Sequence, residues 1–516
     1  MPQLKSADFT NSGTTSAEKS LPLVTKKSNR IRVAYFSQDP PAIDSLSPSF
    51  DPDSYSVIVQ IFDTLVYMDL DGNFKPGLAT HWEKLSATRW RFYLREGVKF
   101  HNGEEFNANA VKFTFDYILN PNNNAGNRWI FSSLKRLIFD PAKPFQIDFE
   151  TYKPDGMFLN RFNMFGSICP PLYIQAKGIE HFRKHPIGTG PFRFSEWSEG
   201  SHILLTRNND YWAQGIPKIN EVKFVVIPKS QWIKSFIEDK VDFIPNLSGN
   251  QTTQLMRRAR GNAKIIKRPV LSSYWVMLRN QGPLASLDFR KALNYAVNKE
   301  DLVRFVDFGN AIPMASLGKQ GEFGFNPELK PYSYSPHKAK ALIDDLGLES
   351  PIKLKSLVAD IAEPAAKVIQ KNLEDVGVEL ELEVVSRSEW ANRVVGYKIQ
   401  TGKPADFDLV INIVDNPVFN LAFHAGLFLD SNSPWSLLND KELDIRLQDT
   451  LNTADEKEHE KRLQALDRFI HEQAFMLFTT QKIITAAVKK EIDINTFGAN
   501  GHLDYEVLSN ANFVKE

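Results

Sequence analysis

Residues 269–306 show two hydrophobic periods in succession, and they predict a strand followed by helices. Residues 271–279 are rich in aromatic and β-branched side chains, which favour a strand. A period of two residues puts Tyr274 and Trp275 on opposite faces of that strand. Gln281-Gly282-Pro283 ends it, because glycine opens turn conformations and proline cannot donate to a ladder.

The chain beyond this strand has the pattern of an α/β unit. Ser286 caps a helix whose apolar residues recur at i, i+3, i+4 and i+7. Residues 352–384 then read as strand, helix and strand, with Gly377 just past the helix, which predicts a parallel βαβ unit with a right-handed crossover. Residues 407–413 predict a further strand.

The first part of the chain is richer in strands and turns, and it predicts α+β structure. Residues 31–36 predict a strand, residues 55–67 have apolar side chains at helical spacing, and Asn107 caps a second helix. Near the end, residues 475–488 form a long strand-like run without a turn residue. A run of that length can cross between two lobes.

Composition excludes several classes of protein. At 516 residues the chain is too long for one core, so two or three domains are expected. Lysine plus arginine equals aspartate plus glutamate, at 62 each, which argues against a nucleic-acid-binding protein. The single cysteine, Cys169, rules out an intrachain disulfide or a cysteine-based metal site. No apolar run is long enough for a transmembrane helix.

The first 28 residues are polar and lack the apolar centre of a secretory signal. We interpret them as a flexible leader that remains where a signal peptide was removed or replaced. The alternative is a cytoplasmic protein with an irregular N-terminus.

The sequence gives no positive support for catalysis. His181 and His185 are four residues apart, but they lack the intervening acid of a zinc-protease helix. Cys169 stands beside two prolines without an obvious base, and the acidic residues are scattered. We therefore predict no catalytic residues, no metal and no cofactor.

Asp415 is a different kind of candidate. It follows the strand predicted at 407–413, and ligands of parallel α/β sheets bind outside the carboxyl ends of strands. A carboxylate there could pair with a ligand ammonium. The alternative is an aspartate that only initiates a turn by bonding to its own backbone. The residues alone leave both interpretations open.

Four segments together resemble the family 5 extracellular solute-binding proteins, which are the oligopeptide-, dipeptide- and nickel-binding components of ABC importers. The resemblance covers roughly residues 30–515. It is carried by the blocks PGLATHWE to FTFDYIL (76–119), GTGPFRFSEW (188–197), NNDYW (208–212) and LDFRKALNYAVNKEDLV (287–303).

This resemblance implies a bilobal flytrap fold of the periplasmic-binding-protein type, α/β with a mixed α+β first lobe. Lobe I would be discontinuous, lobe II would be one segment, and an extra subdomain would be inserted into lobe I. The expected boundaries are residues 29–50, 186–269 and 487–516 for lobe I, 51–185 for the inserted subdomain, and 270–486 for lobe II.

The resemblance also implies a site. VDNPVFNL (414–421) is similar to the turn whose aspartate holds the ligand's amine in peptide-binding relatives, and Asp415 occupies that position. The strand at 271–279 corresponds to one that pairs with extended peptides. The expected ligand-binding residues are Asp415, Trp275, Tyr274, Asn412, Asn416, Trp129 and Trp435. Only one of Tyr274 and Trp275 is expected to line the pocket, because they lie on opposite faces.

The function implied is that of a periplasmic, monomeric, non-enzymatic receptor. It would close over a peptide or peptide-like solute and deliver it to the membrane permease of an ABC importer. The alternatives are an opine, a glycoside or a metal chelate as the ligand, or a chaperone or sensor with the same fold.

Overall fold

The structure is a computed structural model that describes residues 29–36, 38–48, 54–69, 72–404, 406–498 and 501–514. The leader expected at residues 1–28 lies outside these residues. Within the described part of the chain, no helix combines the length and the hydrophobicity needed to cross a bilayer.

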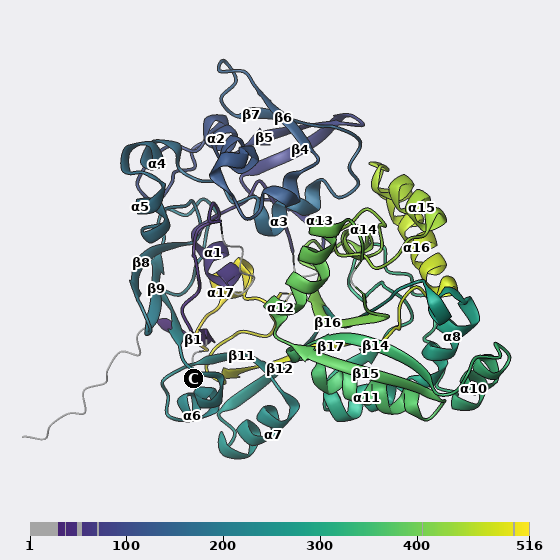
Figure 1. The fold of residues 1–516 in the computed structure, drawn as a ribbon. Coiled ribbons are helices and arrows are strands. Elements are labelled where there is room, and N and C mark those ends of the chain that lie inside the picture. The colour runs from purple at the N-terminus through teal and green to yellow at the C-terminus, as the bar shows by residue number, and fades with distance from the viewer. Residues whose placement is uncertain are drawn as a thin grey trace, which may run out of the picture.

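One mixed sheet runs through most of the molecule (Figure 1). β13 (Ala311–Pro313) pairs with β17 off its main path. The strands of that path, in spatial order, are β15 (Val378–Val385), β14 (Ile352–Ala359), β16 (Leu409–Asp415), β12 (Ala263–Leu278), β17 (Thr480–Lys489), β11 (Phe243–Leu247), β1 (Arg30–Phe36), β10 (Glu221–Val226), β9 (His202–Arg207) and β8 (Phe192–Ser198).

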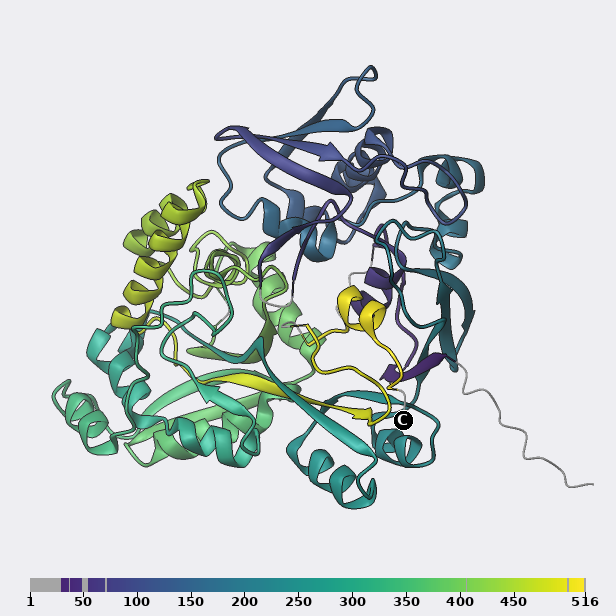
Figure 2. The same cartoon turned by 180° about the vertical axis from the view of Figure 1, so that it is seen from behind.

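Strand β12 joins the two ends of this sheet because it changes partner along its length. Its first part pairs with β17 up to the pair Pro269–Ile483, and after a register shift Ser273 pairs with Gln481 of the same strand. Its second part pairs with β16 from Ser272 onward. The register shifts between Pro269 and Ser273, where a proline cannot donate to the ladder. The strand begins at Ala263 and not at the predicted Leu271. Its first part runs alongside β17 (Figure 2).

The predicted βαβ unit is confirmed. β14 and β15 pair in parallel from Ile352–Val378 to Ala359–Val385, and α11 (Glu363–Glu374) connects them. α8 (Leu287–Ala296) is capped by the Ser286 side chain, as predicted. α8 and α11 cover one face of this end of the sheet and bury Leu293, Ile369 and Leu373 against it. α14 (Leu421–Phe428) covers the other face.

Residues 79–151 form a separate antiparallel sheet, which packs on α2 (Ala108–Leu119) through a core of phenylalanines such as Phe115 and Phe149. The N-cap of α2 is Asn107, as predicted. The strands of this sheet, in spatial order, are β4 (Ala79–Ser86), β5 (Arg89–Leu94), β7 (Gln146–Thr151) and β6 (Leu134–Phe139). β2 (Val66–Met68) and β3 (Phe74–Pro76) form a small ribbon beside it.

The helix predicted over 55–67 is shorter, because α1 ends at Ile61 (Tyr55–Ile61). Asp63 lies just beyond it and is buried. Its carboxylate accepts hydrogen bonds from Thr189, Tyr211 and Trp212, each at 2.9 Å. These three bonds anchor the chain to residues 189–212, and they replace the continuation of the helix.

The remaining α-helices are distributed around the sheets, some at the periphery, such as α10, and some near the centre, such as α17 (Figure 1). They are α3 (Phe162–Phe165), α4 (Pro171–Lys177), α5 (Ile179–Lys184), α6 (Trp232–Ile237), α7 (Gly249–Arg258), α9 (Lys299–Asp301), α10 (Pro336–Asp344), α12 (Arg387–Ala391), α13 (Tyr397–Thr401), α15 (Lys441–Leu451), α16 (Glu456–Gln473) and α17 (Tyr505–Asn510).

Candidate functional site

The carboxylate of Asp415 stands at the exposed end of β16. Asp415 is the last residue of that strand, not the second residue after it as the predicted boundary implied. Its side chain is exposed and makes no hydrogen bond or ion pair within the described part of the chain. The carboxylate is therefore available to a ligand, which a purely turn-forming aspartate would not be.

Asn416 holds the turn that presents Asp415. Its backbone N–H donates to Leu271 O, and its side chain donates to Glu322 and to Asn420 O. Its Oδ1 accepts from Val418 N at 3.0 Å. Asn416 is fully buried, so its amide is committed to the turn. The expectation that it contacts a ligand is not supported by these contacts.

Tyr274 and Trp275 lie on opposite faces of β12, as the period of two predicts. The Tyr274 hydroxyl donates to Asp307 Oδ1 at 3.0 Å and accepts from Lys482 Nζ at 2.9 Å, on the face that α8 and α11 cover. Trp275 packs on Phe428 of α14, with ring centroids 4.4 Å apart, on the same face as Asn412. Tyr274 is thus held by structural contacts.

The Trp275 face contains a buried basic group that the sequence did not single out. The Lys319 ammonium lies 5.8 Å from the Trp275 ring centroid and 3.2 Å from Nδ1 of His424. His424 Nε2 lies 3.0 Å from the carbonyl oxygen of Asp415. Because a carbonyl only accepts, Nε2 carries the proton, so Nδ1 accepts from Lys319. Lys319, His424 and the Asp415 turn are therefore joined by hydrogen bonds.

Two of the buried polar groups on this face, the Lys319 ammonium and the Trp275 indole N–H, have few hydrogen-bond partners. Lys319 is fully buried, and within the described ranges no carboxylate lies within 4.0 Å of its ammonium. Burial lowers its pKa, and Glu322, Asp415 and Asp467 act against that shift. Burial and then Lys319 hold the pKa of His424 well below its usual range. The Trp275 Nε1–H is buried and has no acceptor. Unpaired buried donors cost about 1–3 kcal/mol each, so this face lacks an acceptor.

A run of rings connects three of the expected aromatic residues. Trp129, which is 49% exposed, packs on Phe423 of α14 at a centroid distance of 5.9 Å. His424 and Phe428 of the same helix pack on Trp275. Trp435 closes the run, 5.9 Å from Phe428. Helix α14 thus brings Trp129, Trp275 and Trp435 into one aromatic group around the Asp415 turn.

The same turn forms part of a seam between two regions of the chain. We use "seam" for the contacts of residues 66–165 with residues 271 and 415–423. Asn160 Nδ2 donates to Val418 O at 3.0 Å, and Asn420 Nδ2 donates to Asn160 Oδ1 at 3.4 Å. Met68 packs with Leu271 and Phe419. The seam is closed in this structure, with Asp415 beside it.

Lys319 and His424 were missed because nothing local marks them. They are 105 positions apart in the sequence, and Lys319 lies in a segment with little regular structure. A lone histidine on an apolar helix is usually a core residue. The only available signal was that His424 interrupts the apolar helix LAFHAGLF directly after the Asp415 turn.

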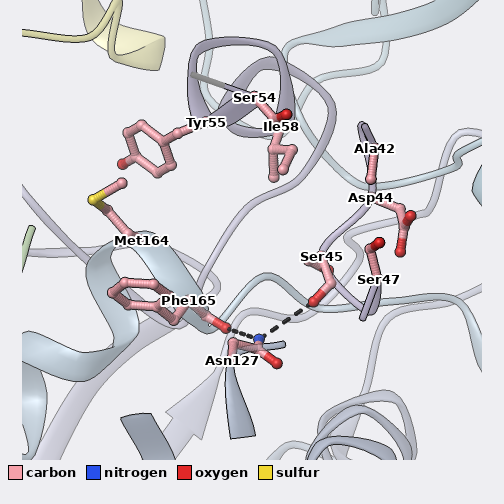
Figure 3. A pocket seen from close by; sticks show the side chains of 10 residues that line it. All are labelled: Ala42, Asp44, Ser45, Ser47, Ser54, Tyr55, Ile58, Asn127, Met164 and Phe165. Carbon is pink, nitrogen blue, oxygen red and sulfur yellow. Dashed lines mark hydrogen bonds between the residues drawn. The ribbon is translucent and has the colours of Figure 1, made fainter. Parts of the chain in front are cut away.

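Two enclosed cavities lie elsewhere. One is lined by the 42–47 loop, α1 and α3, and Asn127 closes it by donating to Ser45 O and Phe165 O (Figure 3). The other lies between Tyr67, Trp212 and Tyr505. Each holds about 30 Å³, which suits a water molecule and not a peptide. None of the seven expected site residues lines either cavity. No group of three or more metal-ligating side chains occurs in the described ranges.

Comparison with known proteins defines the family. The family model for bacterial extracellular solute-binding proteins, family 5, matches residues 73–418, which is most of the chain. The chain belongs to this family. It is 25% identical over 458 residues to the dipeptide-binding protein of Escherichia coli K12, covering 81% of this chain and 82% of that protein.

Solved structures confirm the predicted fold. The ABC transporter substrate-binding protein CtaP of Listeria monocytogenes superposes with a TM-score of 0.82 at 21% identity, covering 95% of this chain and all of that one. NikA of Brucella suis, in complex with Fe(III)-EDTA, gives a TM-score of 0.79 at 24% identity, covering 92% of this chain and 99% of that one. At these identities the structures establish the family 5 binding-protein fold and leave the ligand open.

Proposed function

We propose that this family 5 protein is a receptor for peptides or peptide-like zwitterions, and that it delivers them to the permease of an ABC importer. The observation that carries the proposal is the charge pattern beside the seam. The carboxylate of Asp415 makes no hydrogen bond or ion pair in the described part of the chain. The backbone carbonyl of the same residue is joined through His424 to the buried ammonium of Lys319, which has no carboxylate within 4.0 Å there. A ligand with an ammonium and a carboxylate complements both groups. The dipeptide-binding relative supports this class of ligand.

Each group has a defined role in this proposal. Asp415 binds the ligand's amine, and Lys319 and the Trp275 Nε1–H supply donors for a carboxylate or carbonyl oxygen. The aromatic group around α14 covers the apolar part of the ligand. Asn412 lies opposite Trp275 in the β12–β16 ladder, and it lines the same face. The chemistry is binding without a covalent step, so the protein acts as a receptor and not as an enzyme.

The lobe division is part of the same proposal. Residues 29–50, 186–269 and 487–516 form lobe I, residues 51–185 its inserted subdomain, and residues 270–486 lobe II. The pairing of β12 with β17 supports hinge crossings near residues 269 and 487, because both strands pass from one end of the sheet to the other. Ligand contacts to both sides of the seam favour closure by hinge motion. The protein works outside the cytoplasm as a monomer.

A metal chelate is the second candidate ligand, because the NikA relative holds Fe(III)-EDTA. The Lys319 and Trp275 donors also suit the carboxylates of such a chelate. The two candidates differ at Asp415, because an anionic chelate brings no ammonium and is repelled by this carboxylate.

The deciding experiment is calorimetric titration with a dipeptide, its Nα-acetylated form, its C-terminal amide and Fe(III)-EDTA. We expect Asp415→Asn to weaken the free-amine dipeptide about thirtyfold, the equivalent of about 2 kcal/mol for a charge-assisted hydrogen bond. The same substitution should change the affinity for the acetylated dipeptide little.

Asp406→Asn is the matched control, because Asp406 is a highly exposed aspartate near the start of the same strand. It should leave all affinities unchanged. An equal loss of affinity for the free and acetylated dipeptides would remove the role of Asp415. Tight binding of the chelate with no binding of any peptide would favour the second candidate.

A further inference from the structure

A basic hollow lies at the C-terminal end of α7, apart from the seam. It measures about 540 Å³. α7 begins with a capping box at Ser248 and buries only Leu255 fully, so its last turn is open to solvent. α6 and α7 lie side by side below β11 and β12 (Figure 1). The hollow is lined by Phe236, Ile237, Arg257, Arg258, Ala259, Arg260, Asn262 and Lys489.

The turn after α7 brings a third arginine into this hollow. Arg257 and Arg258 end the helix, and Arg260 follows with a left-handed φ of 47°. Cations in the last turn of a helix are favoured by its dipole, which is sufficient reason for the first two. It is not sufficient for Arg260, which lies past the helix end in a conformation that costs a non-glycine residue about 1–2 kcal/mol.

The positive charge of the hollow is not compensated. In the described part of the chain, Arg257, Arg258 and Arg260 have no carboxylate within 4.0 Å. The two nearby acids are already paired: Glu238 with Lys240 at 2.8 Å, and Asp239 with Lys489. The Lys489 side chain is only 3% exposed and lies over the Phe236 ring, and its ion pair with Asp239 leaves the three arginines as the uncompensated charges of the hollow.

We propose that this hollow binds a phosphate-type anion, either free or as the headgroup of an anionic phospholipid. Guanidinium groups present paired N–H donors that match phosphate oxygens, and three arginines line this hollow with no carboxylate within 4.0 Å in the described part of the chain. Phe236 and Ile237 also line the hollow and offer apolar contacts beside the charges. The site is separate from the solute receptor function, and the test does not depend on that function.

The test compares two triple variants of the full chain. Arg257→Gln/Arg258→Gln/Arg260→Gln removes three charges from the hollow. Lys291→Gln/Lys330→Gln/Lys338→Gln removes three charges from a second basic hollow of about 420 Å³, beside Tyr295 and Tyr332. Binding of inorganic phosphate is followed by phosphorus NMR. Binding of phosphatidylglycerol vesicles and of phosphatidylcholine vesicles is followed by co-sedimentation.

We expect the wild type to bind phosphate or phosphatidylglycerol, and the arginine variant to bind at least about tenfold more weakly, with the lysine variant unchanged. Binding of phosphate alone identifies a free anion, and binding of vesicles alone identifies a headgroup. The proposal is overturned if the wild type binds neither, or if both triple variants lose binding equally. Arg260→Gly is a second variant that should fold at least as well as the wild type, since glycine suits its φ, and it should weaken binding about threefold.

Discussion

The two faces of strand β12 differ in how completely their polar groups are paired. On the Tyr274 face, the hydroxyl, the Lys482 ammonium and the Asp307 carboxylate bond to one another. Thr480 adds a further bond to the same carboxylate. On the Trp275 face, the indole N–H has no acceptor and the Lys319 ammonium has one neutral partner, His424. The polar groups around Tyr274 are therefore fully hydrogen-bonded, whereas those around its neighbour Trp275 are not. We call these the satisfied and the unsatisfied face of β12.

This difference changes the energetic cost of the polar groups on the two faces. A buried group that is fully paired adds little net energy but costs much to break, whereas an unpaired one costs energy in the resting state. An unpaired buried donor in a native structure calls for an explanation, such as strain, a bound water or a ligand. The Tyr274 face is thus a structural clamp on β17, and a role of the Trp275 face in ligand binding is the proposal that the following predictions test.

The largest expected effect is on the satisfied face. Asp307→Ala leaves the Lys482 ammonium and the Tyr274 hydroxyl without their shared acceptor. We expect the free energy of unfolding in urea to fall by about 4 kcal/mol, as for removal of one member of a buried ion pair. Asp406→Ala, at an exposed position, is the control. Solute affinity of the folded Asp307→Ala protein should stay within about twofold of the wild type, and a larger loss would mean that both faces serve the ligand.

The next effect concerns Asp467, a buried aspartate of α16 whose charge acts on Lys319. Asp467 accepts from Gly318 N at 3.1 Å beside Lys319, and burial raises its pKa to about 6 from an ordinary 3.8. The folded state therefore holds the proton more tightly than the unfolded state. Stability should fall as pH rises from about 4 to about 6, by up to about 3 kcal/mol.

Asp467→Asn should remove this pH dependence, because the amide keeps the acceptor without the charge. The measurement is the difference in unfolding free energy between wild type and variant at pH 4 and pH 7.5. Asp44 and Asp504, whose pKa values burial raises to about 6 and about 7, titrate alike in both proteins. They therefore cancel in the comparison. A difference that does not change with pH would show that Asp467 is ionised throughout.

These groups also mark how far sequence reasoning reaches. The βαβ unit at 352–385 and the Ser286 cap were predictable, because hydrophobic period and capping chemistry are local. The start of β12 was not, because the pattern predicted a strand only from Leu271 and left Lys264, Lys267 and Arg268 outside it. Those residues form a strand through pairing with β17, more than 200 positions away.

The site shows the same limit. Asp415 and Trp275 were predicted as ligand-binding residues because one follows a predicted strand and the other lies on a strand with clear alternation. Lys319 and His424 come together only through the tertiary fold, so no local pattern could have paired them. Asn416 was expected to contact a ligand because it lies in a turn similar to a ligand-binding turn. Its side-chain amide instead bonds to backbone groups of the turn itself.

Lys319→Met tests the unsatisfied face directly. Loss of this ammonium should weaken the binding of a peptide with a free carboxylate about a hundredfold. This loss lies within the 2–5 kcal/mol typical of truncating a buried charged partner. The C-terminal amide of the same peptide should lose much less. Stability should hold or rise, because a buried charge with one neutral partner is removed.

Lys353→Met, at an exposed lysine, is the control for Lys319→Met, and it should change neither affinity nor stability. A marked destabilisation by Lys319→Met without a change in affinity would assign Lys319 to the structure, like Lys482 on the other face.

Trp275→Phe gives the smallest and most specific effect, because it removes the indole N–H and keeps most of the ring. If the ligand supplies the missing acceptor, affinity should fall about tenfold, the worth of one hydrogen bond in a dry site, and thermal stability should stay the same or rise slightly. Trp390→Phe is a matched control, because the Trp390 N–H already donates to Leu357 O at 3.2 Å. That variant should lose stability and keep its affinity. If both variants behave alike, the unpaired indole has no role in binding, and the contrast between the two faces of β12 reduces to packing.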